Sequence, residues 1–268
     1  MIETHHISKS FDGFKAVDDI SLQVQQGENM VLLGRSGCGK TTLLKMINRL
    51  IEPDAGEILI AGEPVLEKDP AMLRRKIGYV LQNTGLFPHY TVAENIAIVP
   101  RLLGWEKQKI YERTIDLLGK LHLPVEQTLA AYPAQLSGGQ QQRVGLARAL
   151  AADPPVLLMD EPFGALDPIT RAAVRKDFLR LDELKSKTII LVTHDVQEAF
   201  EMGDRITLMD KGKIVQVGTP AELLHHPANE YVSAFFEDQR FALEAAMIDA
   251  GDHEALIKAF SHYKNQAN

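Results

Sequence analysis

The chain has 268 residues, of which 45% are hydrophobic and 24% are charged, and its formal net charge is −7 at pH 7. This length is enough to bury a full core in one large or two modest domains, and the acidic balance argues against a nucleic-acid partner. No apolar run reaches the roughly 18 residues of a membrane helix, and no apolar signal segment opens the chain, so we expect a cytosolic protein.

The first 30 residues predict a β-hairpin. The stretches "IETHHI" and "DDISLQVQQGE" alternate between apolar and polar residues, and Asp12-Gly13 separates them. A short apolar run, "MVLL" at residues 30–33, is typical of a buried strand. Residues 42–47 then place apolar side chains at helical spacing, which predicts a helix.

The stretch between this strand and this helix, "GRSGCGKTT", fits the phosphate-binding pattern G-x-x-x-x-G-K-[ST]. In such a loop, backbone N–H groups surround a polyphosphate, the lysine reaches the outer phosphates and the hydroxyl meets magnesium. A helix that begins near Lys40 also directs its free N–H groups at the phosphates. We therefore predict a nucleotide site formed by Gly34, Ser36, Gly37, Cys38, Gly39, Lys40, Thr41 and Thr42.

Cys38 is the single cysteine, so the chain has no internal disulfide. Two interpretations of its place in the loop stay open. It is a small residue tolerated at a variable position, or it is a reactive thiol whose pKa is lowered by the helix N-terminus and Lys40.

After this helix, the pattern alternates between short strands and helices. Residues 52–65 predict two strands of a small antiparallel sheet, and "KIGYVLQ", residues 76–82, predicts a buried strand that ends on Gln82. Residues 86 to about 152 have helical spacing. Buried strands follow at 155–160 and 188–193, with an amphipathic helix from about 169 to 184 between them, which indicates a parallel sheet.

Polar residues follow the predicted buried strands. Asp160 and Glu161 come directly after "VLLM", and His194 follows the next strand. A parallel sheet presents its ligand side at the carboxyl ends of its strands, so these residues are candidates for chemistry. In the alternative interpretations, the acids are solvated surface, Gln82 is only a polar group at a strand end, and "THD" caps the following helix.

The stretch "LSGGQQQRVGLARAL", residues 136–150, predicts a second helix with an anion-binding start. Ser137 is a good N-cap residue and two glycines follow it. Two such helix starts cannot both be the main binding site of the same triphosphate. The simplest geometry is a head-to-tail pair of subunits with ATP between them.

These motifs, in this order and at these intervals, closely resemble the nucleotide-binding subunits of ABC transporters over about residues 2–237. The resemblance implies an α/β P-loop NTPase of ABC type, as domain 1–237. It would have a mainly parallel core sheet, a flanking antiparallel β subdomain and an inserted helical subdomain at about 86–152. The hairpin predicted at residues 204–220, with its turn at Lys211-Gly212, precedes further helices. Residues 238–268 would form a short helical C-terminal extension.

The resemblance also implies roles for the motif residues, with ATP and Mg²⁺ as ligands. Lys40 would bind the β and γ phosphates, while Thr41, Gln82 and Asp160 would complete the metal and water shell. Glu161 would be the catalytic base, and His194 would hold Glu161 and the water. The residues Ser137, Gly138, Gly139 and Gln140 would act from the opposite subunit. Asp167 of "GALD" would lie at the nucleotide, and Phe11 would stack on adenine unless it belongs to the core.

Longer stretches, among them "MINRLIEPDAGEI" and "MDEPFGALDPITR", resemble ATPases of bacterial importers for quaternary ammonium osmoprotectants such as glycine betaine, choline and carnitine. An importer for another small polar solute, such as an amino acid, and a soluble non-transport ABC ATPase stay open as alternatives. Many members carry a C-terminal pair of regulatory domains, which we do not expect here because the chain ends at Asn268.

The importer resemblance implies partners as well. We expect an ATP-dependent homodimer, peripheral on the cytoplasmic face of the plasma membrane, with an extracytoplasmic substrate-binding protein as an indirect partner. The transmembrane permease subunits would dock near Gly85–Tyr90, where Leu86, Phe87 and Tyr90 form an apolar set. In the alternative interpretation, these three side chains belong to the domain core.

Overall fold

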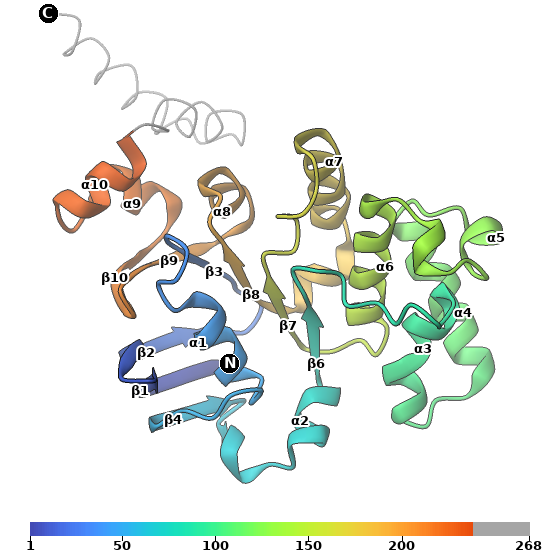
Figure 1. The fold of residues 1–268 in the computed structure, drawn as a ribbon, viewed down its shortest axis with the longest axis horizontal. Helices are drawn as coiled ribbons and strands as arrows, with labels where there is room; N and C mark the ends of the chain where they lie inside the picture. Colours follow the sequence, from blue (N-terminus) through green and yellow to red (C-terminus); the bar gives the residue numbers. More distant parts are fainter. Residues whose placement is uncertain (238–268) are drawn as a thin grey trace, which may run out of the picture.

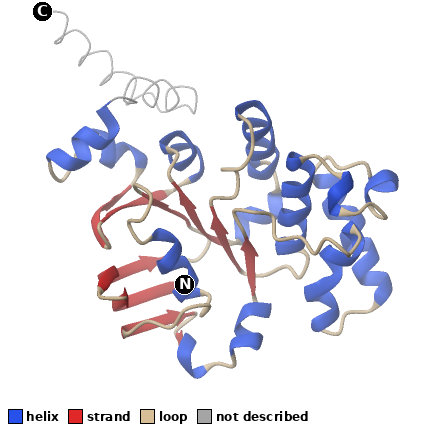
Figure 2. Ribbon diagram, viewed as in Figure 1, coloured by secondary structure: helices blue, strands red, loops and turns tan. Residues whose placement is uncertain are grey.

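The computed structural model describes residues 1–237, which form two sheets with helices around them (Figures 1 and 2). The smaller sheet is antiparallel and has the order β2-β1-β4-β5. Its strands confirm the predicted N-terminal hairpin and the two strands after it: β1 (Ile2–Phe11), β2 (Phe14–Val24), β4 (Ala55–Ile60) and β5 (Glu63–Pro64).

The larger sheet has the order β10-β9-β3-β8-β7-β6. All of its neighbouring pairs are parallel except β10 with β9, an antiparallel hairpin at one edge. Every residue of β7 and β8 is buried, as their unbroken apolar runs predict for a sheet covered on both faces. The strands are β3 (Asn29–Leu33), β6 (Ile77–Val80), β7 (Val156–Asp160), β8 (Thr188–Thr193), β9 (Arg205–Asp210) and β10 (Lys213–Gly218).

Helix α1 (Lys40–Ile47) lies between the two sheets (Figure 1). Its buried residues share one apolar cluster with β1 and β2 on one side and with β3 and β8 on the other. A second cluster covers the opposite face of the large sheet and includes side chains of α3, α4, α6, α7, α8, α9 and α10. Burial of these two faces is the main stabilising term of the fold.

The remaining helices follow the predicted order. Between β6 and β7, α3 to α6 form a lobe beside the large sheet (Figure 1). The helices are α2 (Pro70–Arg75), α3 (Val92–Leu102), α4 (Lys107–Lys120), α5 (Val125–Thr128), α6 (Gly138–Leu150), α7 (Pro168–Leu179), α8 (Val196–Met202), α9 (Pro220–His225) and α10 (Glu230–Glu237), with short 3₁₀ turns at Val65–Glu67, Pro133–Gln135 and Asp182–Ser186.

Two predicted element ends are wrong. Strand β6 ends at Val80 and not at Gln82, because β7 pairs with it only through Val80. Helix α7 ends at Leu179 and not near residue 184: the N–H of Leu181 donates to the carbonyl of Phe178, which tightens the last turn. The chain then continues into the 3₁₀ turn that carries Glu183.

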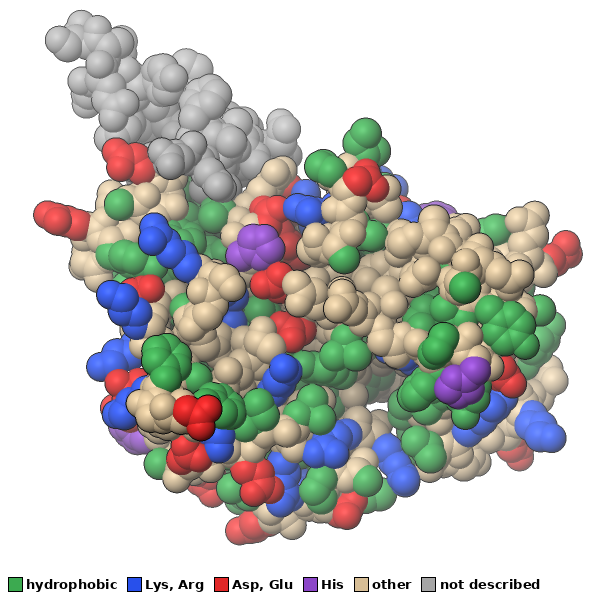
Figure 3. All heavy atoms as spheres, viewed as in Figure 1, with side chains coloured by type: hydrophobic (Ala, Val, Ile, Leu, Met, Phe, Trp, Pro, Cys, Tyr) green, Lys and Arg blue, Asp and Glu red, His purple; other side chains and the backbone are tan. Residues whose placement is uncertain are grey.

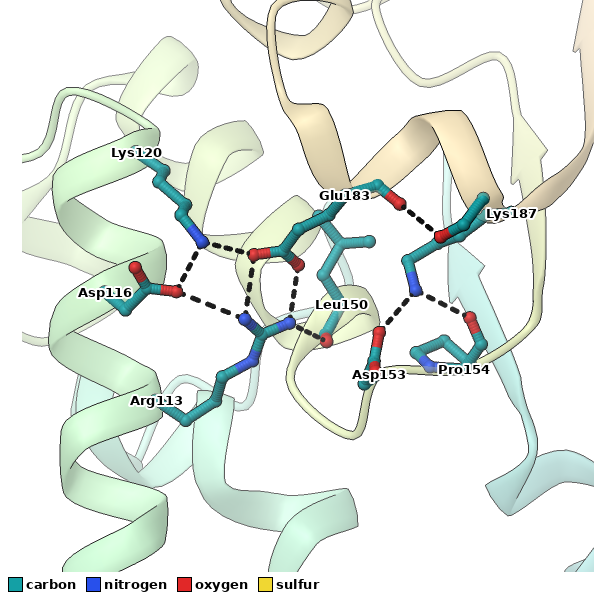
Figure 4. A network of polar contacts seen from close by, with 9 residues as sticks. Arg113, Asp116, Lys120, Leu150, Asp153, Pro154, Glu183 and Lys187 are labelled. Carbon is teal, nitrogen blue, oxygen red and sulfur yellow. Dashed lines mark hydrogen bonds and ion pairs between the residues drawn. The ribbon is translucent and has the colours of Figure 1, made fainter. Parts of the chain in front are cut away.

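An ionic network connects the helical lobe to the core (Figure 4). The guanidinium of Arg113 on α4 donates to both carboxylate oxygens of Glu183, at 2.8 and 2.6 Å, and to the carbonyl of Leu150 at 3.0 Å. Lys120, about two turns further along α4, reaches Glu183 and Asp116 at 2.6 and 2.7 Å. Burial alone would raise the pKa of Glu183, but the hydrogen bonds from Arg113 and Lys120 lower it to about 2.

Among residues 1–237, no helix has both the length and the apolar character that crossing a bilayer requires. The predicted helical extension, residues 238–268, lies outside the described residues.

We expect Glu183→Gln to lower the free energy of unfolding by about 2 kcal/mol at pH 7, because Arg113 and Lys120 then lose their shared anion. The native pKa of Glu183 lies below its ordinary value of 4.5, so this stabilisation is present above pH 4.5 and is lost as pH falls toward 2. Urea unfolding at several pH values measures it. Asp182→Asn is the matched control, because its carboxylate is 88% exposed and pairs with the exposed Lys185. If Glu183→Gln and Asp182→Asn changed the free energy of unfolding equally, the stabilising role of the Glu183 network would be contradicted.

Candidate nucleotide and hydrolysis site

The predicted phosphate loop joins β3 to α1, and α1 begins at Lys40 as predicted. The Lys40 side chain is only 4% exposed. Its ammonium donates to the carbonyls of Gly34 and Arg35, at 2.7 and 3.0 Å, so it lies inside the curve of the loop. Ser36 and Gly37, at the tip of the loop, are exposed. The loop therefore presents backbone N–H groups and one buried cation around the start of a helix.

Two of the loop glycines are required by close packing. A Cβ atom at Gly34 would lie 2.3 Å from the carbonyl oxygen of Met209, and one at Gly39 would lie 2.2 Å from that of Ala16. Gly39 also has φ +104°, a conformation that other residues rarely adopt. The loop is thus held between the end of β9 and strand β2.

The end of β7 lies next to this loop. The hydroxyl of Thr41 donates to the carboxylate of Asp160 at 2.8 Å, although the two residues are 119 positions apart. Asp160 is 7% exposed, and burial raises the pKa of its carboxyl while the bond from Thr41 opposes that shift. The hydroxyl of Thr41, the carboxylate of Asp160 and the amide oxygen of Gln82 are the hard oxygen donors that Mg²⁺ prefers, so this set fits the ion.

Glu161 receives contacts from two neighbouring loops. The amide nitrogen of Gln82 donates to its Oε2 at 3.1 Å, and Nδ1 of His194 lies 3.2 Å from the same oxygen. Glu161 has φ +43°, an uncommon conformation for a non-glycine residue, and its N–H donates to the carbonyl of Val192 at 2.9 Å. The carboxylate is 19% exposed, so it is not a solvated surface acid.

His194 is 59% exposed and does not cap the following helix. The side chain of Asp195 is the cap of α8, because its Oδ1 accepts from the N–H of Glu198 at 3.1 Å. Asp195 is therefore the residue of "THD" that caps the helix, and the His194 side chain contacts Glu161 instead.

The residues Ser137–Gln140 lie at the start of α6, in the helical lobe. Ser137 and Gln140 form the predicted cap: the Ser137 N–H donates to Oε1 of Gln140 at 2.9 Å, and the Gln140 N–H donates to the Ser137 hydroxyl at 3.3 Å. Ser137 and Gly138 are exposed, while Gly139 is buried so close to α7 that a Cβ would lie 2.6 Å from Thr170. Within residues 1–237 of one chain, none of the hydrogen bonds of this segment reaches the phosphate loop.

Two further predicted residues lie apart from this cluster. Asp167 caps α7, where its Oδ1 accepts from the Thr170 N–H at 3.1 Å. Phe11, at the end of β1, is 44% exposed, so the alternative that it belongs to the core is wrong. The ammonium of Lys9 lies 5.6 Å from the centre of its ring. Thr42, in the first turn of α1, is half-buried.

The predicted partner segment after Gln82 is held rigidly. Asn95 on α3 is fully buried, and its amide nitrogen donates to the carbonyls of Phe87, Tyr90 and Thr91, all at 3.0 or 3.1 Å. Arg148 on α6 donates to the carbonyls of Gly85 and Thr84, at 2.7 and 2.8 Å. Both residues were missed from the sequence, where a polar residue inside a helical pattern is the only signal of this role.

Phe87 and Tyr90 expose 45% and 38% of their surface, so the alternative that they belong to the core is wrong. Leu86 packs partly against the core. Phe87 borders a groove that both apolar and cationic residues line. They include Leu81, Ile98, Val99, Pro154, Arg74, Arg75 and Arg148.

Comparisons with known proteins find one matching family model and several similar ATP-binding proteins. A family model described as "ABC transporter" matches residues 17–164. The osmoprotectant import ATP-binding protein of Salmonella typhimurium is 51% identical over 257 residues, 94% of this chain and 67% of that one. The glycine betaine/carnitine/choline transport ATP-binding protein of Bacillus subtilis is 53% identical over 90% of this chain, which spans 63% of that relative's length.

A solved dimeric ATP-binding cassette in a post-hydrolysis state, bound to ADP and Pi, resembles the whole fold. It is 33% identical and matches with a TM-score of 0.73 over 82% of this chain and 98% of that one. This similarity confirms the predicted ABC-type fold.

The interpretation of Cys38 as a reactive thiol is wrong. Its side chain is 4% exposed, and burial raises the pKa of the thiol in spite of the nearby Lys40 ammonium. We expect alkylation of native Cys38 at pH 7.5 to be at least about 100-fold slower than in urea, because the thiolate is scarce and shielded. Mass spectrometry of iodoacetamide-treated protein measures both rates. Similar rates in the folded and unfolded chains would contradict the burial of this thiol.

Proposed function

Because the chain belongs to the ABC transporter family of ATP-binding proteins, we propose that it hydrolyses ATP to power import of a quaternary ammonium compound such as glycine betaine, choline or carnitine. The observation that supports hydrolysis is the Glu161 carboxylate, contacted by Gln82 and His194 beside the Thr41–Asp160 pair. The substrate class is supported by the relatives that are more than half identical, whose names state osmoprotectant or glycine betaine, carnitine and choline transport.

We assign the reaction to these side chains as follows. Lys40 and the N-terminus of α1 bind the β and γ phosphates of ATP, and Thr41 and Asp160 hold Mg²⁺, which neutralises phosphate charge when bound. Glu161 takes a proton from the attacking water or orients it. His194 and Gln82 hold the Glu161 carboxylate and the water in line with the γ phosphate, and Phe11 stacks on adenine.

The start of α6 supports a dimeric arrangement. Ser137 and Gly138 are exposed at a helix N-terminus whose first turn carries no acidic residue, and this end suits the γ phosphate of ATP held by a second copy. We propose a head-to-tail homodimer in which Ser137–Gln140 at the start of α6 and Asp167 at the start of α7 complete the nucleotide site of the partner. The related cassette that was solved with ADP and Pi is dimeric.

The groove beside Phe87 is the proposed docking site for the transmembrane permease subunits. Hydrophobic side chains gather over the helical lobe on the face drawn in Figure 3, with Lys and Arg side chains below them. A groove lined by both apolar and cationic residues suits a short amphipathic helix. We propose that the protein works at the cytoplasmic face of the plasma membrane and serves an extracytoplasmic binding protein through the permease, without a nucleic-acid partner.

We expect Lys40→Ala to lower ATP turnover by about 100-fold or more, since the ammonium is lost from the phosphate site. The purified variant is assayed for phosphate release, and uptake of labelled glycine betaine and choline is measured in cells that carry it. The cells must lack other importers for these compounds.

The two measurements separate the parts of the proposal. Loss of hydrolysis together with uptake supports both parts. If hydrolysis falls and uptake does not, the ATPase assignment stands and another solute must be sought. Full hydrolysis by Lys40→Ala would overturn the assignment of the site itself. Lys107→Ala, which removes an exposed lysine at the start of α4 in the helical lobe, is the matched control.

We expect Phe87→Ala to reduce uptake by about tenfold while hydrolysis by the isolated subunit changes less than twofold, because an exposed aromatic anchor is removed from the docking surface. Tyr111→Ala removes an aromatic side chain of similar exposure, 52%, from α4, outside the groove. Equal uptake by the two variants would rule out the docking role of Phe87.

A further inference from the structure

A buried carboxyl lies four residues after His194. Glu198, in the first turn of α8, is 3% exposed, and its Oε2 accepts a hydrogen bond from the Thr193 hydroxyl at 2.7 Å. Its other oxygen, Oε1, is buried and has no hydrogen-bond partner within residues 1–237. The hydrolysis scheme assigns no task to this residue. A buried acid with one unpaired oxygen costs stability, so its presence calls for a reason other than packing.

Glu198 is connected to the residues on both sides of His194. Its side chain holds the hydroxyl of Thr193, and that hydroxyl in turn accepts the N–H of Asp195 at 3.0 Å. Its backbone N–H donates to the Asp195 carboxylate at 3.1 Å. His194 therefore projects from a three-residue segment whose two flanking residues are held by Glu198, directly or through one hydroxyl.

We propose that Glu198 is a positioning residue for hydrolysis: through Thr193 and Asp195 it fixes the backbone from which His194 reaches Glu161. The inference rests on the proposed role of His194. The imidazole is 59% exposed, and its only described polar contact is the 3.2 Å approach of Nδ1 to Glu161. An exposed side chain with one contact depends on its backbone for direction, and Glu198 supplies that constraint.

The charged groups around Glu198 make the constraint on His194 depend on whether the Glu198 carboxyl is protonated. Asp195 faces Glu198 from the same helix start, and Arg171 and Arg175 face it from α7. Both arginines have other carboxylate partners: Arg171 lies 3.4 Å from Asp195, and Arg175 lies 2.8 Å from Glu201. Burial raises the pKa of Glu198 to about 7, so both forms are populated near neutral pH. Ionisation strengthens the hydrogen bond from Thr193, but it also places an anion in a buried site beside Asp195. The pKa of Glu198 is raised, so these two costs outweigh the stronger bond and ionisation destabilises the segment.

The test uses two substitutions that separate hydrogen bonding from charge. Glu198→Gln keeps an oxygen acceptor for Thr193 and cannot ionise. Glu198→Leu keeps the volume and the burial but removes the acceptor. Glu201→Gln, on the same helix, is the matched control, because it removes a carboxylate that pairs with Arg175 and has no link to Thr193.

We expect Glu198→Leu to lower kcat for ATP hydrolysis by about tenfold, with KM for ATP within about twofold of wild type, because the phosphate loop is untouched. Glu198→Gln should hydrolyse ATP at the wild-type rate at pH 6.5. The ratio of its kcat to that of wild type should rise by about threefold or more between pH 6.5 and 8.5, since only wild type ionises at residue 198. Glu201→Gln should show neither effect.

A ratio that stays constant across this pH range, or wild-type kcat in Glu198→Leu, would overturn the proposal. If Glu198→Leu does not fold, the ratio for Glu198→Gln still decides, because that variant is isosteric. If the proposed function itself is wrong, the outcome is different: wild type and Lys40→Ala would then hydrolyse ATP at the same rate.

Discussion

The site depends on the parallel register of four buried strands. Leu33 pairs with Thr193, Asp160 with Val192 and Val80 with Met159, so β3, β8, β7 and β6 end at one edge of the sheet. Interior side chains on both faces fix this register, because a shift of one strand would move its residues out of two packed layers at once. The polar groups of the site occur at or just after these strand ends: Asp160 is the last residue of β7, Glu161 and His194 are the first residues after β7 and β8, and Gln82 is the second residue after β6.

Much of this arrangement could be predicted from the sequence, because unbroken apolar runs report strands that are buried on both faces, and the glycine-rich loop has a strict chemical pattern. The adjacency of Gln82 and Asp160 also followed from the motifs. The order in which the strands pair could not be predicted from periodicity alone, since pairing is set by contacts between distant segments. The end of α7 was missed for the same reason: Glu183 turns toward Arg113, which lies 70 positions earlier.

Buried polar side chains were the other limit of sequence analysis. Local chemistry around Cys38 favours a thiolate, but Met209 and the rest of the loop exclude water from the sulfur, and burial dominates its pKa. Asn95 and Glu198 occupy helices whose patterns place one polar residue at the edge of an apolar face. Whether such a residue lies in solvent or beneath a neighbouring loop depends on tertiary contacts.

Asn95 and Arg148 already donate to the carbonyl groups of Thr84, Gly85, Phe87, Tyr90 and Thr91 before any partner arrives. A helix that docks on Phe87 therefore meets an ordered surface, and the free energy of association is not reduced by the conformational entropy of folding a loop. Stiffness has a mechanical result as well. If the permease docks as proposed, a displacement of Phe87 would reach Gln82, five residues earlier in the chain, and with it the Glu161 carboxylate that Gln82 contacts at 3.1 Å.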